Sequence, residues 1–161
     1  MAHALNNYEV SRYLTRVSSP YSLSDAKAFI ERQRSFDPRS TVCAITFKCA
    51  PDELLGLVAF EQNSKDGTFE FGYWLSEACW GMRIMSEAAG AMVCHAFSSS
   101  TVNVLTAGYW NPVSGCLLRN LGFVETHAAP SFSLALGKSV LSTRLELTAA
   151  TWLDQQKSRA A

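Results

Sequence analysis

The sequence predicts a single domain of the α/β or α+β class, in which helices lie on both faces of one sheet. Three observations support this prediction. The chain has 161 residues, which is the length of one ordinary domain. Stretches with the periodicity of strands alternate with stretches with the periodicity of helices, and such an order is typical of a sheet covered by helices. No internal repeat or low-complexity segment divides residues 1–161.

Two helical patterns come first. The apolar side chains of residues 7–14 fall on one side, as in a short amphipathic helix. Ser22 and Asp25 resemble a capping box. Apolar residues at helical spacing follow them, so we expect a helix over residues 23–35.

Three strands are expected next. Residues 41–47 and 54–60 are rich in β-branched and apolar side chains, and residues 51–53 between them have the composition of a turn. This pattern predicts a hairpin. Residues 69–75 form the third expected strand.

The second half of the chain alternates in the same way. Residues 84–97 carry pairs of apolar side chains, which predict a helix packed on a sheet. Residues 102–109 alternate as a strand does, and residues 132–136 and 143–148 predict a final hairpin.

A short helix after residue 109 has a clear start and end. Asn111 is a strong N-cap, Pro112 suits the first helical position, and Gly122 suits a left-handed stop. We expect its core face to carry the four-residue repeat of Val113, Leu117 and Leu121.

This arrangement leaves Asn111 and Ser114 on another face, near the start of the helix. Two small polar groups at a helix start suit a ligand, and they are also common in helices that bind nothing.

The composition argues against several functional classes. The 14 basic and 14 acidic residues are scattered and sum to a net charge of zero, so we expect no nucleic acid or anionic membrane partner. The five cysteines and three histidines share no ligand spacing, so we expect no metal. No apolar run approaches the roughly 18 residues of a membrane span, and no apolar signal region opens the chain. We therefore expect a cytoplasmic protein.

A strand, a loop and a helix follow one another between residues 69 and 97, with Trp80-Gly81 in the loop. A helix start can bind phosphate oxygens, because its first N–H groups have no partner in the helix and the positive end of the helix dipole lies there.

These two regions together resemble the GNAT superfamily of N-acyltransferases, specifically its RimJ/RimL-like branch. Trp80-Gly81 and Ser86-Glu87-Ala88 are similar to the branch's Trp-Gly-x-Gly-x-x-Thr-Glu-Ala pattern. Asn111-x-x-Ser114 followed by Leu121-Gly122-Phe123 is similar to the end of the conserved fold. The sequence departs from the pattern at Ala78, where the family has Arg or Gln, and at Arg83, where it has a second Gly or Ala.

The resemblance implies a GNAT fold with a single mixed, mostly antiparallel sheet. Family members usually begin with a strand ahead of the region that matches Asn6-Asn7, so we expect the first strand to be missing. The strand at residues 41–47 should then have an unpaired edge, covered by a partner chain or by the N-terminal segment. A homodimer is one such arrangement, and a truncated product that folds only as a swapped oligomer is another.

The resemblance also implies acetyl-CoA as co-substrate and direct attack by a primary amine, without a covalent enzyme intermediate. The pyrophosphate would bind at the start of the predicted helix, the pantetheine arm along Asn111, and the acetyl carbonyl at backbone amides of the 69–75 strand. The residues implied in cofactor binding are Tyr73, Trp74, Leu75, Gly81, Met82, Arg83, Ile84, Met85, Ser86, Asn111 and Ser114.

Two side chains are implied in catalysis. Glu70 matches the general base of some GNAT enzymes, and partial burial beside Phe69, Phe71 and Tyr73 would suit it for proton transfer. The alternative for Glu70 is a solvent-facing or salt-bridged carboxylate. Ser114 would protonate or hydrogen-bond the departing thiolate, and its alternative is a purely structural place in the first turn.

Three questions stay open in the sequence. Leu118 stands where many relatives have a tyrosine that protonates the thiolate. Arg83 would either obstruct the diphosphate or pair with it, and obstruction together with Ala78 would fit a non-catalytic acyl-CoA-binding or interaction module. The acceptor could be a protein N-terminus, an amino acid, a polyamine or an aminoglycoside, because the first helices and residues 128–142 form the acceptor cleft in this fold and vary.

Overall fold

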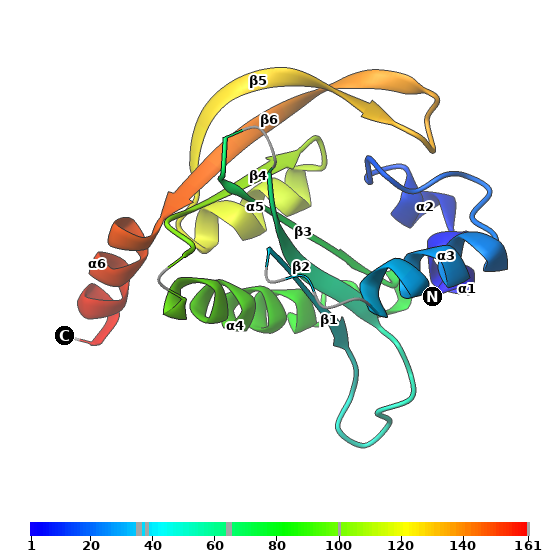
Figure 1. Ribbon diagram of the computed structural model, residues 1–161, viewed down its shortest axis with the longest axis horizontal. Coiled ribbons are helices and arrows are strands. Elements are labelled where there is room, and N and C mark those ends of the chain that lie inside the picture. Colours follow the sequence, from blue (N-terminus) through cyan, green and yellow to red (C-terminus); the bar gives the residue numbers. More distant parts are fainter. Residues whose placement is uncertain (35–36, 38, 64–65, 100, 161) are drawn as a thin grey trace.

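A six-stranded mixed sheet in the order β1-β2-β3-β4-β6-β5 forms the centre of the computed structural model (Figure 1). The structure describes residues 1–34, 37, 39–63, 66–99 and 101–160. The strands are β1 (Ser40–Ile45), β2 (Gly56–Gln62), β3 (Phe69–Leu75), β4 (Val104–Tyr109), β5 (Val124–Ser133) and β6 (Lys138–Thr148). Neighbouring strands run antiparallel except β3 and β4, which are parallel.

Helices cover both faces of this sheet, as predicted. They are α1 (Ala2–Leu5), α2 (Tyr8–Ser11), α3 (Leu23–Arg34), the 3₁₀ helix η1 (Glu77–Cys79), α4 (Ile84–Ser98), α5 (Pro112–Asn120) and α6 (Ala149–Ala160). Buried residues of α4 and α5 pack with Phe71 of β3. Helices α1 to α3 instead pack with Trp74 of the same strand. Because successive strand side chains point to opposite faces, the two groups of helices lie on opposite sides of β3.

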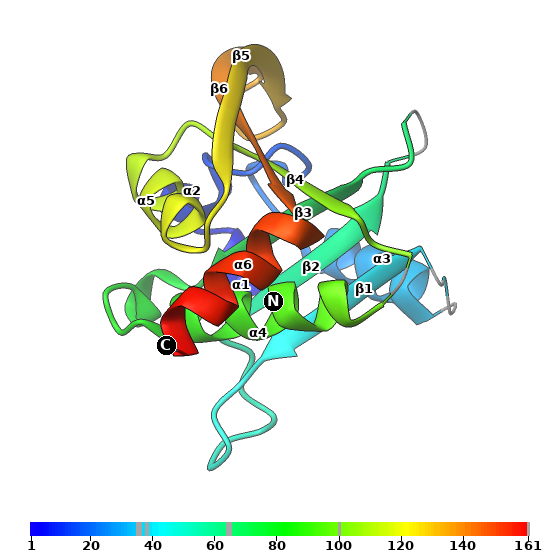
Figure 2. The same ribbon diagram turned by 90° about the vertical axis from the view of Figure 1, so that its left-hand side faces the viewer.

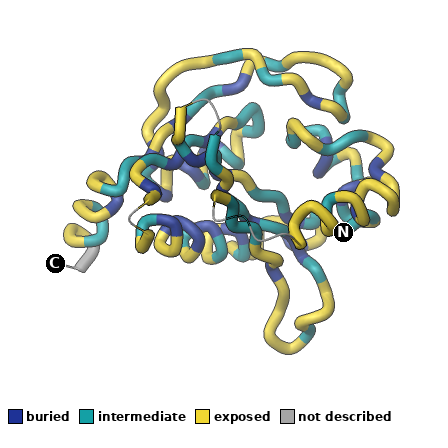
Figure 3. Tube along the Cα trace, in the orientation of Figure 1, coloured by how far each residue is buried: buried dark blue, intermediate teal, exposed yellow. Residues whose placement is uncertain are grey.

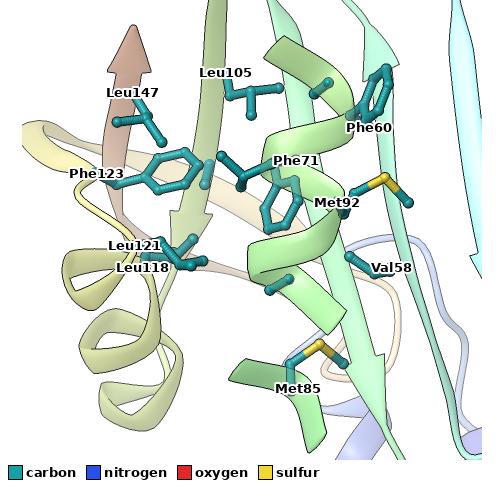
Figure 4. Packing of buried hydrophobic residues seen from close by; sticks show 14 of the residues in the cluster. Val58, Phe60, Phe71, Met85, Met92, Leu105, Leu118, Leu121, Phe123 and Leu147 are labelled. Carbon is teal, nitrogen blue, oxygen red and sulfur yellow. The ribbon is translucent and has the colours of Figure 1, made fainter. Parts of the chain in front are cut away.

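The main core lies between the sheet and the α4 and α5 helices. Figure 4 shows side chains of β2, β3, β4, β6, α4 and α5 meeting in it. Leu105 and Leu145, from the neighbouring strands β4 and β6, are fully buried. Burying a leucine side chain contributes about 1.5–3 kcal/mol, so this core fixes the positions of β3 and β4, whose separation matters for the site.

Strands β3 and β4 pair over only two rungs, Phe69 with Leu105 and Glu70 with Thr106. Beyond Glu70 and Thr106 the two strands separate. We call the space between their later residues the strand gap.

The β5–β6 hairpin curves over the sheet, and its tip lies beside the N-terminal segment (Figures 1 and 2). The backbone N–H of Leu134 donates to the carbonyl of Thr15 at 3.2 Å. The buried Ser133 hydroxyl donates to the carbonyl of Leu14, also at 3.2 Å. These bonds attach the hairpin tip to the loop that follows α2.

The predicted core face of α5 is wrong in one position. Val113 is 75% exposed, whereas Leu118 is 2% exposed and Leu121 is buried. The buried face runs through Gly115, Leu118 and Leu121 at three-residue spacing, and Val113 lies outside it. Asn111 and Gly122 have the predicted roles, since Asn111 is the N-cap and Gly122 has a φ of 96°.

Further differences concern the elements. Strand β6 begins at Lys138, before the predicted residue 143. Strand β5 begins at Val124, well before the predicted residue 132. The prediction missed this part because most of the strand is exposed (Figure 3), so its sequence lacks the alternation of apolar and polar residues. The short helix α1 and the C-terminal α6 were not predicted. Trp152 of α6 is buried, with its ring 6.5 Å from that of Phe97.

Strand β1 is the edge of the sheet, and within the described part of the chain it pairs with β2 alone. The unpaired edge predicted for this strand is therefore present. The N-terminal segment supplies no strand to that edge, since its described residues form α1, α2 and α3. Cover of this edge by a partner chain stays a prediction.

Candidate active site

A cavity of about 1150 Å³ opens on the face of the sheet that α1 to α3 share with the hairpin tip. Its sheet side is formed by Leu57, Ala59, Glu61, Glu70, Gly72, Trp74, Gly108 and Arg144. Tyr13, Phe29, Trp110 and Leu134 line it from the surrounding segments. The expected contribution of the first helices and of residues 128–142 to a cleft is confirmed by this lining.

The same cavity is also lined by residues that point to the opposite face of the sheet. These are Phe71, Tyr73, Ala107, Tyr109, Ser114 and Leu118. One cavity can reach both faces here because β3 and β4 separate beyond Glu70. The strand gap is therefore a passage through the sheet, with the start of α5 at one side and the N-terminal helices at the other.

Tyr73 extends across the strand gap to α5. Its hydroxyl donates a hydrogen bond to the carbonyl of Ser114 at 3.3 Å. Burial raises the pKa of Tyr73 to about 12, so its hydroxyl keeps its proton at neutral pH. Only the backbone of Tyr73 was predicted to matter, because the strand pattern gives no sign that this side chain reaches a helix 41 residues away.

The start of α5 places Asn111 and Ser114 at the cavity, as predicted. The Asn111 Oδ1 accepts from the backbone N–H of Val113 at 3.0 Å, which is an N-cap bond. Its amide nitrogen still carries two donors for a ligand. Leu118, one turn after Ser114, also lines the cavity and offers no polar group.

Glu70 lies where the strand gap begins and is partly buried, as predicted, but the aromatic neighbours predicted for it are wrong. Phe69, Phe71 and Tyr73 pack on the α4 side, and Glu70 points to the opposite face because strand side chains alternate. The Glu70 side chain is 41% exposed and lies between two guanidinium groups, 3.2 Å from Arg16 Nη2 and 3.6 Å from Arg144 Nη2.

Arg16 also contacts Glu61 at 2.7 Å, so four charged side chains meet at this point. We call Arg16, Glu61, Glu70 and Arg144 the charged cluster. The other three members come from distant segments and were not predicted as part of the site. One signal was available, since Glu61 and Glu70 lie directly opposite each other once β2 and β3 are paired as a hairpin.

The loop before α4 has an unusual backbone. Gly81 has a φ of 77°, and Arg83, the N-cap of α4, has a φ of 60°. Arg83 is the single non-glycine residue with a positive φ among the residues that the structure describes. The indole nitrogen of Trp80 donates to the carbonyl of Leu75 at 2.9 Å, which ties this loop to the end of β3.

The side chains of this loop differ in exposure. Gly81, Met82, Arg83 and Ser86 lie at the surface, whereas Met85 is buried and Ile84 is half-buried in the main core. Residues 81–86, all of them described, do not line the cavity. What they can offer a ligand is chiefly the free backbone N–H groups of a helix start.

Among the described residues, no group of three or more His, Cys, Asp or Glu side chains could hold a metal ion. No helix within the described ranges is long and apolar enough to cross a membrane.

Comparisons with known proteins agree with this fold. A family model for the acetyltransferase (GNAT) domain matches residues 1–124. The structure is similar to spermidine N-acetyltransferase from Vibrio cholerae in complex with CoA and spermine, with a TM-score of 0.78 at 17% identity over 94% of this chain and 89% of that one.

Two other solved structures are similar. The microcin C7 self-immunity acetyltransferase MccE in complex with acetyl-CoA and AMP has a TM-score of 0.72 at 17% identity, over 91% of this chain and 86% of that one. A GNAT-family acetyltransferase from Bacillus anthracis has a TM-score of 0.75 at 13% identity, over 93% of this chain and 87% of that one. No curated relative matches the sequence. At these identities the structural likeness concerns the fold.

Proposed function

This chain belongs to the GNAT family of acetyltransferases, and from that premise we propose that it transfers the acetyl group of acetyl-CoA to a primary amine by direct attack. Within the family, we assign it to the RimJ/RimL-like branch on the strength of Trp80-Gly81 and the Asn111-x-x-Ser114 helix start.

The observation that carries this proposal is the single cavity that reaches both faces of the sheet through the strand gap. A thioester and an amine that approach from opposite sides can meet only where the sheet is open. Beyond Glu70, β3 has an edge that β4 does not pair with. Such an edge can hold the amide groups of a pantetheine arm by strand addition.

We place the pantetheine arm of acetyl-CoA in the strand gap and its pyrophosphate outside the cavity. The pyrophosphate lies at residues 81–86, where the N–H groups and dipole of the α4 start favour an anion. The pantetheine arm follows Tyr73, Trp74 and Leu75 on one side and the Asn111 amide nitrogen on the other. Calorimetry and a structure with bound acetyl-CoA test this placement. No heat at millimolar acetyl-CoA would contradict it, and so would a nucleotide bound elsewhere.

The reaction uses the two sides of the strand gap for two proton transfers. Glu70 accepts a proton from the substrate ammonium, directly or through water. The neutral amine then attacks the thioester carbonyl, the carbon–sulfur bond breaks, and the nitrogen loses its second proton as the amide forms; this proton replaces the one that the thiolate takes up. The Tyr73 hydroxyl, held next to Ser114, supplies the proton that the departing thiolate takes up, and the Ser114 hydroxyl supports the same step.

The alternative is an acyl-CoA-binding module without turnover. Two observations favour it: Arg83 stands at the helix start where a ligand phosphate would lie, and the Glu70 carboxylate already contacts two arginines.

The experiment that separates the two is N-acetylation of a panel of primary amines, followed by mass spectrometry of the products. Mass detection is preferable to a thiol reagent, because Cys43, Cys49, Cys94 and Cys116 are free and exposed. An acetylated amine that forms only with the protein supports the enzyme. Calorimetric binding of acetyl-CoA with no product from any amine supports the module.

Two further proposals concern the setting of this protein. Four exposed free cysteines suit a reducing compartment, so we propose that it acts in the cytoplasm. We also propose that a second copy of the chain covers the free edge of β1, as a homodimer.

A further inference from the structure

The charged cluster identifies the class of acceptor. We propose that the acceptor is an amino-acid-like zwitterion, whose ammonium binds Glu70 while its nearby carboxylate binds Arg144 and Arg16. This inference rests on the proposed acetyl transfer and names the substrate of that same site.

The charged cluster lies at the entrance to the strand gap. Glu70 belongs to the last rung that β3 shares with β4, so its carboxylate lies where the amine must enter the strand gap. Arg144 approaches Glu70 from β6, which pairs with the far edge of β4. The ion pair between them therefore spans β4 at the entrance.

The fold leaves room for the Arg144 guanidinium over β4. Gly108 is its register partner on β4. A Cβ on Gly108 would lie only 2.5 Å from Arg144 Nη1, so the glycine leaves the space that the guanidinium occupies over β4, and a side chain there would require the guanidinium to shift. Arg144 is 30% exposed, which makes it the least exposed member of the cluster. It is a positioned cation in the cavity wall.

A ligand can readily replace the ion pairs that Glu70 makes with the two arginines. The Arg144–Glu70 distance is 3.6 Å, and Arg16 is 71% exposed. Exposed ion pairs contribute only about 0.2–1 kcal/mol. A ligand that brings an ammonium to Glu70 and a carboxylate to Arg144 and Arg16 exchanges the two ion pairs of Glu70 for three with the ligand.

The positive and negative charges of the charged cluster balance each other. Two arginines and two glutamates give the charged cluster no net charge. A polyamine, which carries only positive charges, would meet two guanidinium groups beside the carboxylate that it needs. Complementary charges set specificity, and here they favour a molecule that carries both signs close together.

The test compares each common L-amino acid with its own amide, and with spermidine, as acceptors for the unmodified protein. The amide has the same side chain and amine but lacks the carboxylate. We expect at least one amino acid to be acetylated with a kcat/KM about tenfold or more above that of its amide, as one charge-assisted contact provides. Equal or better use of the amide, or of spermidine, overturns the proposal.

The variant Arg144→Gln gives a second readout. It should raise KM for the amino acid by about 10- to 100-fold and reduce kcat/KM for the amide much less, because the amide has no carboxylate for Arg144 to bind. Arg144→Lys should recover part of the loss. An equal loss with both acceptors would show a merely structural role and contradict the proposal.

Failure of the proposed function is distinguishable from failure of this inference. If no acceptor is acetylated, calorimetry of the amino acids and amides on the acetyl-CoA-loaded protein still compares them. Preferential binding of an amino acid then supports the inference, and its absence overturns it.

Discussion

At the scale of single residues, Glu70 has two assignments, as proton acceptor and as partner of two arginines. If it is the base, Glu70→Gln should lower kcat by about 10²- to 10⁴-fold at neutral pH, with little change in the affinity for acetyl-CoA. Steady-state kinetics with calorimetry measures both quantities.

Glu61→Gln is the matched control for this prediction. Glu61 lies directly opposite Glu70 and also pairs with Arg16, but it belongs to β2, one strand further from the strand gap. It should therefore change kcat little. A pH–rate profile that is the same in Glu70→Gln and in the unmodified protein would show that another group, or water, removes the proton.

Tyr73 is the second residue on which the mechanism depends. Tyr73→Phe removes only the hydroxyl and should lower kcat by about 10²-fold or more if this group protonates the thiolate. Ser114→Ala should cost less, about tenfold, because a hydrogen bond is lost and no proton donor is removed. A Tyr73→Phe variant with full activity would contradict the assignment.

The same tyrosine gives a prediction for stability against pH. Burial raises the pKa of Tyr73 to about 12, above its ordinary value of 10. The unfolded chain therefore loses this proton at lower pH than the folded protein does, and stability falls as pH rises from about 10 to 12. Thermal unfolding between pH 9 and 11.5 should show a smaller fall in Tm for Tyr73→Phe, and an equal fall would contradict the buried position.

At the scale of elements, the start of α4 combines the proposed phosphate site with backbone strain. A left-handed conformation costs a non-glycine residue about 1–2 kcal/mol, and Arg83 has a φ of 60°. The absent second glycine of the family pattern lies at this position. The glycine in that pattern therefore has a conformational reason.

Arg83→Gly should stabilise the protein by about 1 kcal/mol, since part of the gain is lost to the freer unfolded chain. Arg83→Ala keeps the strain and should give no such gain. Acetyl-CoA titration of both variants then measures the effect of the Arg83 side chain on cofactor affinity. Tighter binding in both variants shows that this side chain obstructs the diphosphate. Weaker binding in both shows that the guanidinium pairs with the diphosphate. An unchanged Tm in Arg83→Gly would contradict the strain.

The β5–β6 hairpin forms part of the cavity wall, and its tip depends on one buried hydroxyl. Ser133 is fully buried and donates to Leu14 at 3.2 Å. Ser133→Ala leaves that carbonyl without its partner and should cost about 1–3 kcal/mol. The acceptor KM should rise while acetyl-CoA affinity holds, because only the acceptor side of the cavity loosens. Ser139→Ala, at an exposed position of β6, is the control, and an equal KM in all three proteins would count against a role for the hairpin tip.

At the scale of the whole molecule, the free edge of β1 is the feature that concerns assembly. An exposed edge strand is a template for pairing with another chain, and β1 pairs only with β2 within the described residues. We expect a dimer in light scattering at micromolar concentration. Cys43→Lys places a charge at an exposed position of β1 and should shift the protein toward monomer. A monomer in the unmodified protein would contradict the prediction.

Much of the fold was predictable because its signals are local. Strand β3 has the predicted bounds, and the predicted α3, α4 and α5 differ from the observed helices by little at either end. Capping residues and hydrophobic spacing act within one or two turns, so they can be read in the sequence. Strand β5 and helix α6 were less accessible, because β5 is mostly exposed and α6 is held by the single buried Trp152.

The sequence by itself determined the family, the helix start at Asn111, the Gly81 loop before α4, and the presence of Glu70 on β3. The tertiary structure alone decided what surrounds Glu70 and Tyr73. Strand alternation turned Glu70 away from the aromatic core, and Arg16, 54 residues distant in sequence, came to its side. Tyr73 reached Ser114 only because β3 and β4 separate. Such contacts depend on the register and divergence of strands far apart in the chain, and no local pattern specifies those quantities.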